Sequence, residues 1–114
     1  MHESNILLYE TDDGKINVDV ILKEETIWLT QKGMADLFEC SIDNISLHLK
    51  NIFQEKELDK SSTVEFFSVV RKEGNRNVTR NLEFYNLDAI IAVGYRVNSK
   101  KATKFRIWAT KILK

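Results

Sequence analysis

The sequence predicts an α+β fold: an N-terminal β-meander, a helix-turn-helix, a β-hairpin wing and two C-terminal helices, in a winged-helix-like order. Three observations favour it. Residues 5–29 hold three short apolar-rich segments separated by turn sequences, and residues 16–21 of the second segment alternate between two faces, as strands do. Residues 30–53 repeat apolar side chains at intervals of three and four on either side of a short break, which is typical of two short helices. Residues 63–85 hold two segments rich in β-branched and aromatic residues around a Gly-Asn pair, which indicates a hairpin.

The meander accounts for the first 29 residues. Its three expected strands are residues 5–10, 15–22 and 26–29. Thr11 to Gly14 has the composition of a turn, and Gly14 can adopt a positive φ. In the second strand Ile16, Val18 and Val20 fall on one face, which we expect to be buried while the other face is partly wet.

The helix pair begins at Thr30, which is placed to cap a first helix. That helix buries one face, made of Met34, Ala35, Leu37 and Phe38. After the break at Glu39 and Cys40, Ser41 is placed to cap a second helix. The apolar stripe of the second helix is Ile42, Ile45, Leu49, Ile52 and Phe53. Helices this short and this tightly linked are expected to cross rather than run antiparallel, as in a helix-turn-helix.

Two qualifications accompany the helix pair. The helix-turn-helix pattern usually has glycine where this chain has Glu39, so the turn must hold a non-glycine residue in a strained conformation or change its geometry. The alternative is that both segments are ordinary core helices of a small α/β domain.

The hairpin is predicted from residues 63–71 and 77–85, which flank the loop 72–76. Cations gather at and near its tip, at Arg71, Lys72, Arg76 and Arg80. A basic hairpin after a helix-turn-helix has the position of a wing that contacts phosphates. The alternative is an ordinary solvated turn.

Two helices complete the chain. Asn86 is placed to cap the first, residues 87–96, where Gly94 indicates close packing. Ser99 is placed to cap the last helix, whose apolar face is Ala102, Phe105, Ala109, Ile112 and Leu113. Lys100, Lys104, Lys111 and Lys114 line its opposite face, either as phosphate contacts or as a solvated surface. Ile107 interrupts this lysine face.

These segments carry a resemblance to a known family. The chain resembles the RhuM virulence-protein family and, more distantly, the N-terminal domains of Bro and phage antirepressor proteins. The resemblance spans nearly all 114 residues. Its most specific part is an apolar helix, a turn and an A-x-x-F-x-x-W helix, here Arg96, Ser99, Ala102, Phe105 and Trp108. It implies a DNA-binding domain of bacterial accessory or phage-derived genes, often joined to other domains.

Composition sets the broad class. With 114 residues, 43% hydrophobic and 30% charged, the chain has the length of one domain and the composition of a globular protein. No apolar run is long enough to span a bilayer, and the start lacks the pattern of a signal peptide. A single cysteine fits a cytoplasmic protein. Because the helical rhythm continues to Lys114, we expect these residues to be the N-terminal part of a longer protein.

Charge is distributed unevenly. Residues 1–60 hold 13 acids and 6 bases, a net of −7, and residues 61–114 hold 4 acids and 11 bases, a net of +7. A chain divided in this way can present a basic face to phosphates. The alternative is that the halves interleave on folding and no basic patch survives.

Sequence-selective binding of duplex DNA is therefore the first functional hypothesis, for a transcriptional or mobile-element regulator. Asn44 and Asn51 suit bidentate contacts to adenine, and Leu47 suits a thymine methyl. The full set of candidate DNA-binding residues is Gln31, Ser41, Asp43, Asn44, Ser46, Leu47, Lys50, Asn51, Arg71, Lys72, Arg76, Arg80, Lys100 and Lys104.

The second hypothesis is a protein-interaction module of antirepressor type. Three carboxylates near the predicted turn, Asp36, Glu39 and Asp43, favour a protein partner, either a repressor or a second copy of the chain. An enzyme is not expected: His2 and His48 have no partner at metal-ligand spacing, and the sequence has no phosphate-binding loop or nucleophile motif. No cofactor and no metal are predicted.

Overall fold

Five strands form one antiparallel sheet in the computed structural model, which describes residues 5–114. The strands are β1 (Asn5–Glu10), β2 (Asn17–Lys23), β3 (Thr26–Leu29), β4 (Val64–Glu73) and β5 (Arg76–Asn86). The helices are α1 (Gln31–Phe38), α2 (Ile42–Gln54), α3 (Lys60–Thr63), α4 (Leu87–Arg96) and α5 (Lys101–Ile112). The α+β class is confirmed. His2 lies outside the described residues.

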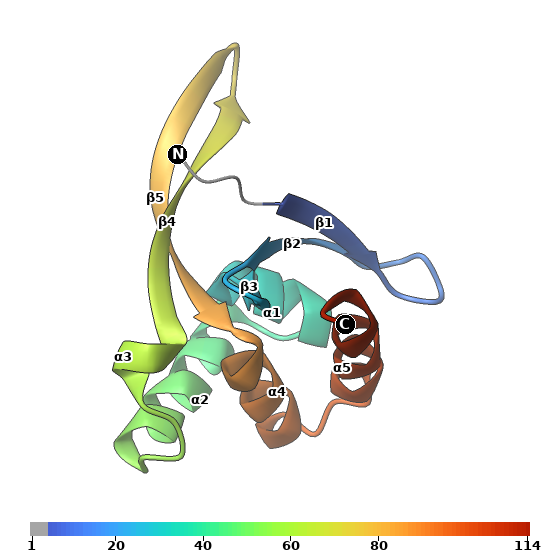
Figure 1. Ribbon diagram of the computed structural model, residues 1–114, viewed down its shortest axis with the longest axis vertical. Helices are drawn as coiled ribbons and strands as arrows, with labels where there is room; N and C mark the ends of the chain where they lie inside the picture. Colours follow the sequence, from blue (N-terminus) through green and yellow to red (C-terminus); the bar gives the residue numbers. More distant parts are fainter. Residues whose placement is uncertain (1–4) are drawn as a thin grey trace.

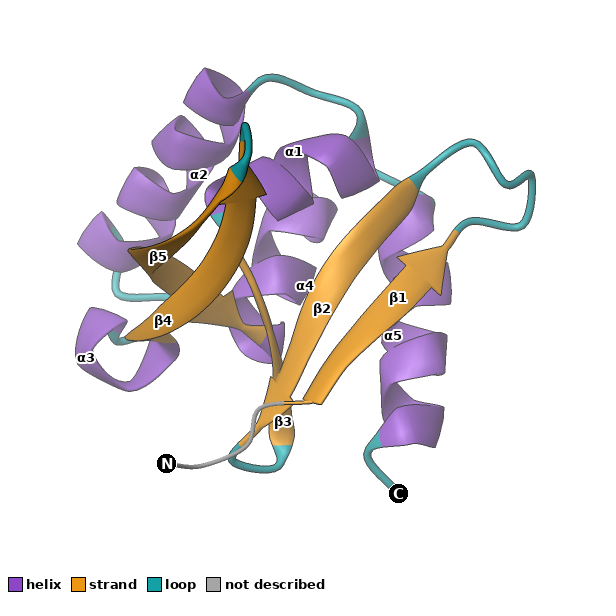
Figure 2. Cartoon of the chain, turned by 90° about the horizontal axis from the view of Figure 1, so that it is seen from above, coloured by secondary structure: helices purple, strands orange, loops and turns teal. Residues whose placement is uncertain are grey.

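The sheet is splayed at its centre. Its strand order is β1-β2-β3-β5-β4, so the short β3 joins the meander to the hairpin. β3 forms three residue pairs with β2 and only two with β5. As a result the β1–β2 and β4–β5 ribbons diverge from β3, while α1, α2, α4 and α5 lie together on one side of the sheet (Figures 1 and 2).

Both predicted strand regions are confirmed, but their joining was not predicted. β1 and β3 have the expected bounds, and β2 is shifted by one or two residues. The hairpin closes with Glu73 opposite Arg76, and Gly74 has a positive φ of 64°, as in a two-residue turn with glycine at its first central position. The expected three-stranded meander is thus one part of a five-stranded sheet.

Apolar side chains pack on both faces of the sheet. The main core lies between sheet and helices and includes Val20, Leu29, Met34, Ile45, Ile90 and Phe105, all almost fully buried. A second cluster, Ile21, Trp28, Phe67 and Phe84, lies on the opposite face. Trp28 and Phe67 meet edge to face at 5.2 Å between ring centroids. The expectation that this face of β2 would be partly wet is confirmed: Asn17 and Asp19 are exposed, whereas Ile21 is buried in the second cluster.

Helix α4 packs closely on α1 and α5 through Gly94. Its predicted bounds are confirmed, and the side chain of Asn86 accepts a hydrogen bond from the Ala89 amide as a cap. A Cβ added at Gly94 would lie 2.4 Å from the Cβ of Ala102 and 2.9 Å from Cζ of Phe38. The expected close packing is confirmed.

Several boundaries differ from expectation. Ile42 is 46% exposed rather than part of the buried stripe, because it starts α2 at the rim of the core, and Ile112 at the end of α5 is 37% exposed. The polar run after Phe53 ends α2 at Gln54 and leads through a turn into the short helix α3, which Asp59 caps and which was not predicted. The cap of α5 falls on Lys100, although Ser99 Oγ accepts a hydrogen bond from the Lys101 amide. Within residues 5–114, no helix is long and apolar enough to cross a bilayer.

The turn between β2 and β3 holds two strained residues. Glu24 and Glu25 have φ values of 56° and 62°, and they lie between the paired Lys23 and Thr26. Two positive φ values are the geometry of a type I′ turn, for which Asn-Gly is the preferred sequence. A side chain with a Cβ is disfavoured in this left-handed region.

Replacing this pair by Asn-Gly (Glu24→Asn with Glu25→Gly) is expected to stabilise the protein. Relief of strain at both positions should raise the free energy of unfolding by about 1 kcal/mol, measured by urea denaturation. The control Glu24→Gln/Glu25→Gln removes the same charges and keeps the strain, so it should leave stability close to wild type. An equal gain in both variants would assign the effect to charge instead.

Candidate nucleic-acid interface

α1 and α2 are joined by a tight turn made of Glu39, Cys40 and Ser41, and each helix has a side-chain cap at its start. Thr30 Oγ1 accepts a hydrogen bond from the Gly33 amide at 3.0 Å, and Ser41 Oγ accepts one from the Asn44 amide at 3.0 Å, so both predicted caps are confirmed. Glu39 takes a left-handed conformation with φ 58°, one of the two outcomes foreseen for a non-glycine residue there. The Cys40 amide then donates to the Ala35 carbonyl and ends α1.

One face of α2 is open to solvent. Ile45, Leu49 and Ile52 fix the opposite face in the core. Asp43, Ser46, Leu47 and Lys50 are exposed on the outer face, and Leu47 retains 54% of its surface. Asn44 and Asn51 lie on the flank and are half-buried, while Ser41 is exposed at the helix start. The predicted residues of α2 thus fall into an outer ridge and a flanking pair.

The open face of α2 borders the base of the hairpin. A surface groove of about 340 Å³ lies between them, lined by Gln31, Ser46, Lys50, Gln54, Glu83 and Tyr85 among others. Gln31 Nε2 donates a hydrogen bond to the Tyr85 hydroxyl at 2.9 Å, which fixes the start of α1 against β5. Burial raises the pKa of Tyr85.

The hairpin carries its cations on two faces. In the β4–β5 register Arg71 lies opposite Val78 and Glu73 opposite Arg76, so by strand alternation Arg71, Arg76 and Arg80 share one face and Lys72 lies on the other. Arg80 forms a two-pronged ion pair with Glu73, with Nη2 2.7 Å from Oε1 and Nε 3.1 Å from Oε2. The hydrogen bonds from Arg80 lower the pKa of Glu73.

The other three hairpin cations are unpaired. Within residues 5–114 no ion pair engages Arg71, Lys72 or Arg76, and all three are exposed. α2, α3 and the hairpin lie along the same side of the molecule, with the hairpin tip projecting away from the helices (Figures 1 and 2). The structure therefore brings the base of the hairpin, and not its tip, next to α2.

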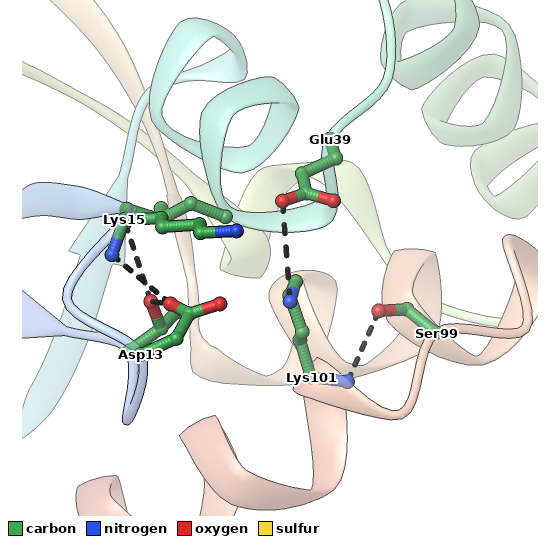
Figure 3. Close-up of polar contacts among 7 residues, drawn as sticks. Asp13, Lys15, Glu39, Ser99 and Lys101 are labelled. Carbon is green, nitrogen blue, oxygen red and sulfur yellow. Dashed lines mark hydrogen bonds and ion pairs between the residues drawn. The ribbon is translucent and has the colours of Figure 1, made fainter.

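The predicted lysines of α5 lie elsewhere. Lys104 pairs with Asp12 in the β1–β2 turn, and Lys100 borders a groove formed with the same turn. Neighbouring Lys101 approaches Glu39 at 4.0 Å, as Figure 3 shows. α5 and the β1–β2 turn lie on the side of the molecule opposite the hairpin (Figures 1 and 2). The structure does not bring Lys100 and Lys104 together with the residues of α2.

Carboxylates near α2 are largely matched by cations. Arg96 at the end of α4 bonds Glu55 at 2.7 Å and Glu57 at 2.9 Å, and these hydrogen bonds raise the pKa of Arg96. At the turn, Asp36 pairs with Lys32 at 3.0 Å. Asp43 lies in the first turn of α2, where the helix dipole favours a negative charge. The acidic first half of the chain is thus partly neutralised around the candidate interface.

The sequence reasoning missed part of the groove. Gln54 follows Ser46 and Lys50 at intervals of four, so helical spacing alone could have identified it. Lys60 and Glu83 also line the groove, but their place depends on α3 and on the hairpin register. Among residues 5–114, no three His, Cys, Asp or Glu side chains lie together as a potential metal site.

The comparisons with known proteins bear on the C-terminal part of the chain. Residues 62–114 match the model of the Virulence protein RhuM family, which covers β4, β5, α4 and α5. The matched segment is a little under half of the chain, and it supports the RhuM part of the resemblance. The search of curated proteins and the search of solved structures each gave no match.

Proposed function

We propose that this protein binds duplex DNA through a winged-helix-like arrangement, with α2 in the major groove and the hairpin along the phosphate backbone. α1, the turn and α2 would form the helix-turn-helix. The observation that carries the proposal is the open outer ridge of α2, which borders the base of a hairpin whose three unpaired cations lie towards its tip. An exposed helix next to a hairpin that carries cations at its far end suits groove entry by the helix combined with phosphate contacts farther along the duplex.

The proposed contacts differ in kind. Ser46, Leu47 and Lys50 on the outer ridge are best placed to meet base edges or phosphates, and Asp43 can accept a hydrogen bond from cytosine. Asn44 and Asn51 would contribute from the flank, and Gln31 and Ser41 from the two helix starts. Phosphate contacts would come from the hairpin cations. A protein of this kind would act as a transcriptional or phage-related regulator in the cytoplasm, in line with the antirepressor side of the resemblance.

Because Glu73 is paired with Arg80, the hairpin offers one variant that should weaken DNA binding and another that should strengthen it. Arg76→Ala removes an unpaired cation and should weaken binding to all sequences, lowering the slope of log affinity against log salt by about 0.9. Arg80→Ala should have a smaller effect, because Glu73 already neutralises that guanidinium. Glu73→Gln frees Arg80 and should strengthen binding. The measurement is fluorescence anisotropy of a mixed-sequence duplex across a salt series.

The three hairpin variants also control one another. All three side chains lie on the same face of the hairpin, so a general disturbance of the hairpin would shift affinity in one direction. Identical affinities and salt slopes for wild type, Arg76→Ala and Glu73→Gln would remove the hairpin from the interface. A selection from random oligonucleotides would then show whether α2 reads sequence.

A protein partner is the second candidate function. It is favoured by the exposure of two large apolar side chains on α2, Ile42 at 46% and Leu47 at 54%, since apolar groups that stay in water on a helix suit a protein surface. In this case the purified protein would ignore duplex DNA at low salt and would retain a purified repressor on an affinity column. Duplex binding at low salt would decide for the first function.

A further inference from the structure

β4 is an open edge of the sheet. It is the last strand in the order β1-β2-β3-β5-β4, and it is ten residues long. In an antiparallel ladder every second residue directs its N–H and C=O groups away from the neighbouring strand, so this edge offers unpaired backbone groups. Phe66 and Val70 on one face of β4 are 60% and 69% exposed. A long edge with exposed apolar side chains is suited to pairing with another strand.

We propose that two copies of this chain pair antiparallel through β4, centred on Ser68, to form a homodimer with a continuous sheet. The segment from Glu65 to Arg71 of each copy would form the shared ladder. This interaction surface includes none of the residues of the proposed DNA-binding ridge on α2, and of the hairpin cations its matched ion pair uses only Arg71. It can also be tested without DNA, so its result does not depend on the proposed function.

β4 is complementary to itself, which identifies β4 of a second copy as the strand that pairs with this edge. Residues directly opposite each other in an antiparallel pair share a face and interact. Centring on Ser68 places Glu65 of each copy opposite Arg71 of the other, so the symmetric pair contains this charge match twice. Phe66 then lies opposite Val70 on the other face, also twice, which is a favourable aromatic and β-branched pair. Glu65 and Arg71 are both exposed, and within residues 5–114 neither has an ion-pair partner.

Neighbouring registers are less favourable. Facing residues must share a face of the sheet, so the two-fold centre of the pairing must fall on a residue. The nearest alternatives to Ser68 are therefore Phe67 and Val69. Centring on Val69 places Glu65 opposite Glu73, which repels, and Phe66 opposite Lys72. Centring on Phe67 leaves Glu65 opposite Val69 and Phe66 opposite Ser68. The charges and the apolar pairs match together only in the Ser68 register.

A charge swap tests the pairing. Sedimentation of the full chain without DNA should show a dimer that dissociates on dilution. Glu65→Arg and Arg71→Glu should each raise the dissociation constant at least about tenfold, since like charges lie opposite each other. The double variant Glu65→Arg/Arg71→Glu should restore the wild-type value. A wild-type chain that stays monomeric, or a double variant no tighter than the singles, would overturn the proposal.

A disulfide tests the register. Ser68→Cys places a thiol opposite its own copy, and oxidation should give a covalent dimer. The matched control is Asn81→Cys, which lies opposite Ser68 on β5 and is exposed on the same face. Two copies of residue 81 would be about 14 Å apart, three strand spacings, too far for a disulfide. Equal crosslinking of both variants, or none in Ser68→Cys, would contradict the register.

Discussion

Replacing Gly94 by alanine is expected to lower the free energy of unfolding by about 2 to 3 kcal/mol. In a helix interior this substitution ordinarily stabilises by roughly 1 kcal/mol. Here the new methyl group would lie 2.4 Å from the Cβ of Ala102, which is fixed to the α5 backbone. It would also lie 2.9 Å from the ring of Phe38. α4 would therefore have to move away from both α1 and α5, with urea denaturation as the measurement.

Two variants separate this contact from a general effect of glycine. In Gly33→Ala in α1 the new methyl group would lie closest to the flexible end of Leu29, at 3.1 Å, and would reach Thr30 Oγ1 at 3.4 Å, an ordinary contact. The stability of this variant should remain within about 1 kcal/mol of wild type. Gly94→Ala/Ala102→Gly removes the tighter of the two clashes and should recover part of the loss. A Gly94→Ala protein as stable as wild type would show that α4 is not held at this distance.

Reversing charge on the outer ridge of α2 should abolish most DNA binding. Ser46→Glu/Lys50→Glu places two carboxylates where the proposal puts the groove, and we expect affinity to fall about a hundredfold, roughly 2.8 kcal/mol. Both side chains are exposed, so folding should be unaffected, as circular dichroism and thermal unfolding can verify. The binding measurement is fluorescence anisotropy at low salt.

The matched control for the ridge is Lys111→Glu on α5. Lys111 is exposed, and its helix lies on the opposite side of the molecule from the hairpin (Figures 1 and 2). This single reversal should weaken binding only slightly, through net charge. If the ridge variant bound as tightly as the α5 variant, α2 would not be the groove-reading element.

The elements that sequence predicted well depend on local rules. Thr30, Ser41 and Asn86 each cap a helix because a short polar side chain precedes a helical apolar pattern. The hairpin follows from Gly74 and the β-branched residues around it. Each of these features is decided within a few residues along the chain.

What sequence did not predict depends on distant contacts. The pairing of β3 with β5 through Leu29 and Tyr85 joins segments more than fifty residues apart, and it creates the second core cluster. The lysine face of α5 has a regular helical pattern, but the ion pair of Lys104 with Asp12 depends on where β1 and β2 turn. At the candidate site, Ser46 and Lys50 follow from helical spacing, whereas Lys60 and Glu83 join them only through tertiary packing.

The placement of α1, α2, α4 and α5 on a single side of the sheet determines what a β4-paired homodimer would present. Strands that pair antiparallel are related by a two-fold axis perpendicular to the sheet, so both copies of α2 would emerge on the same side. Val64 would lie opposite Lys72 of the second copy, which separates the two β4 starts by about 27 Å. Each α2 lies near the start of its own β4, and one turn of B-DNA spans about 34 Å. If such a dimer also binds DNA as proposed, its expected target is an inverted repeat with half-sites about one helical turn apart.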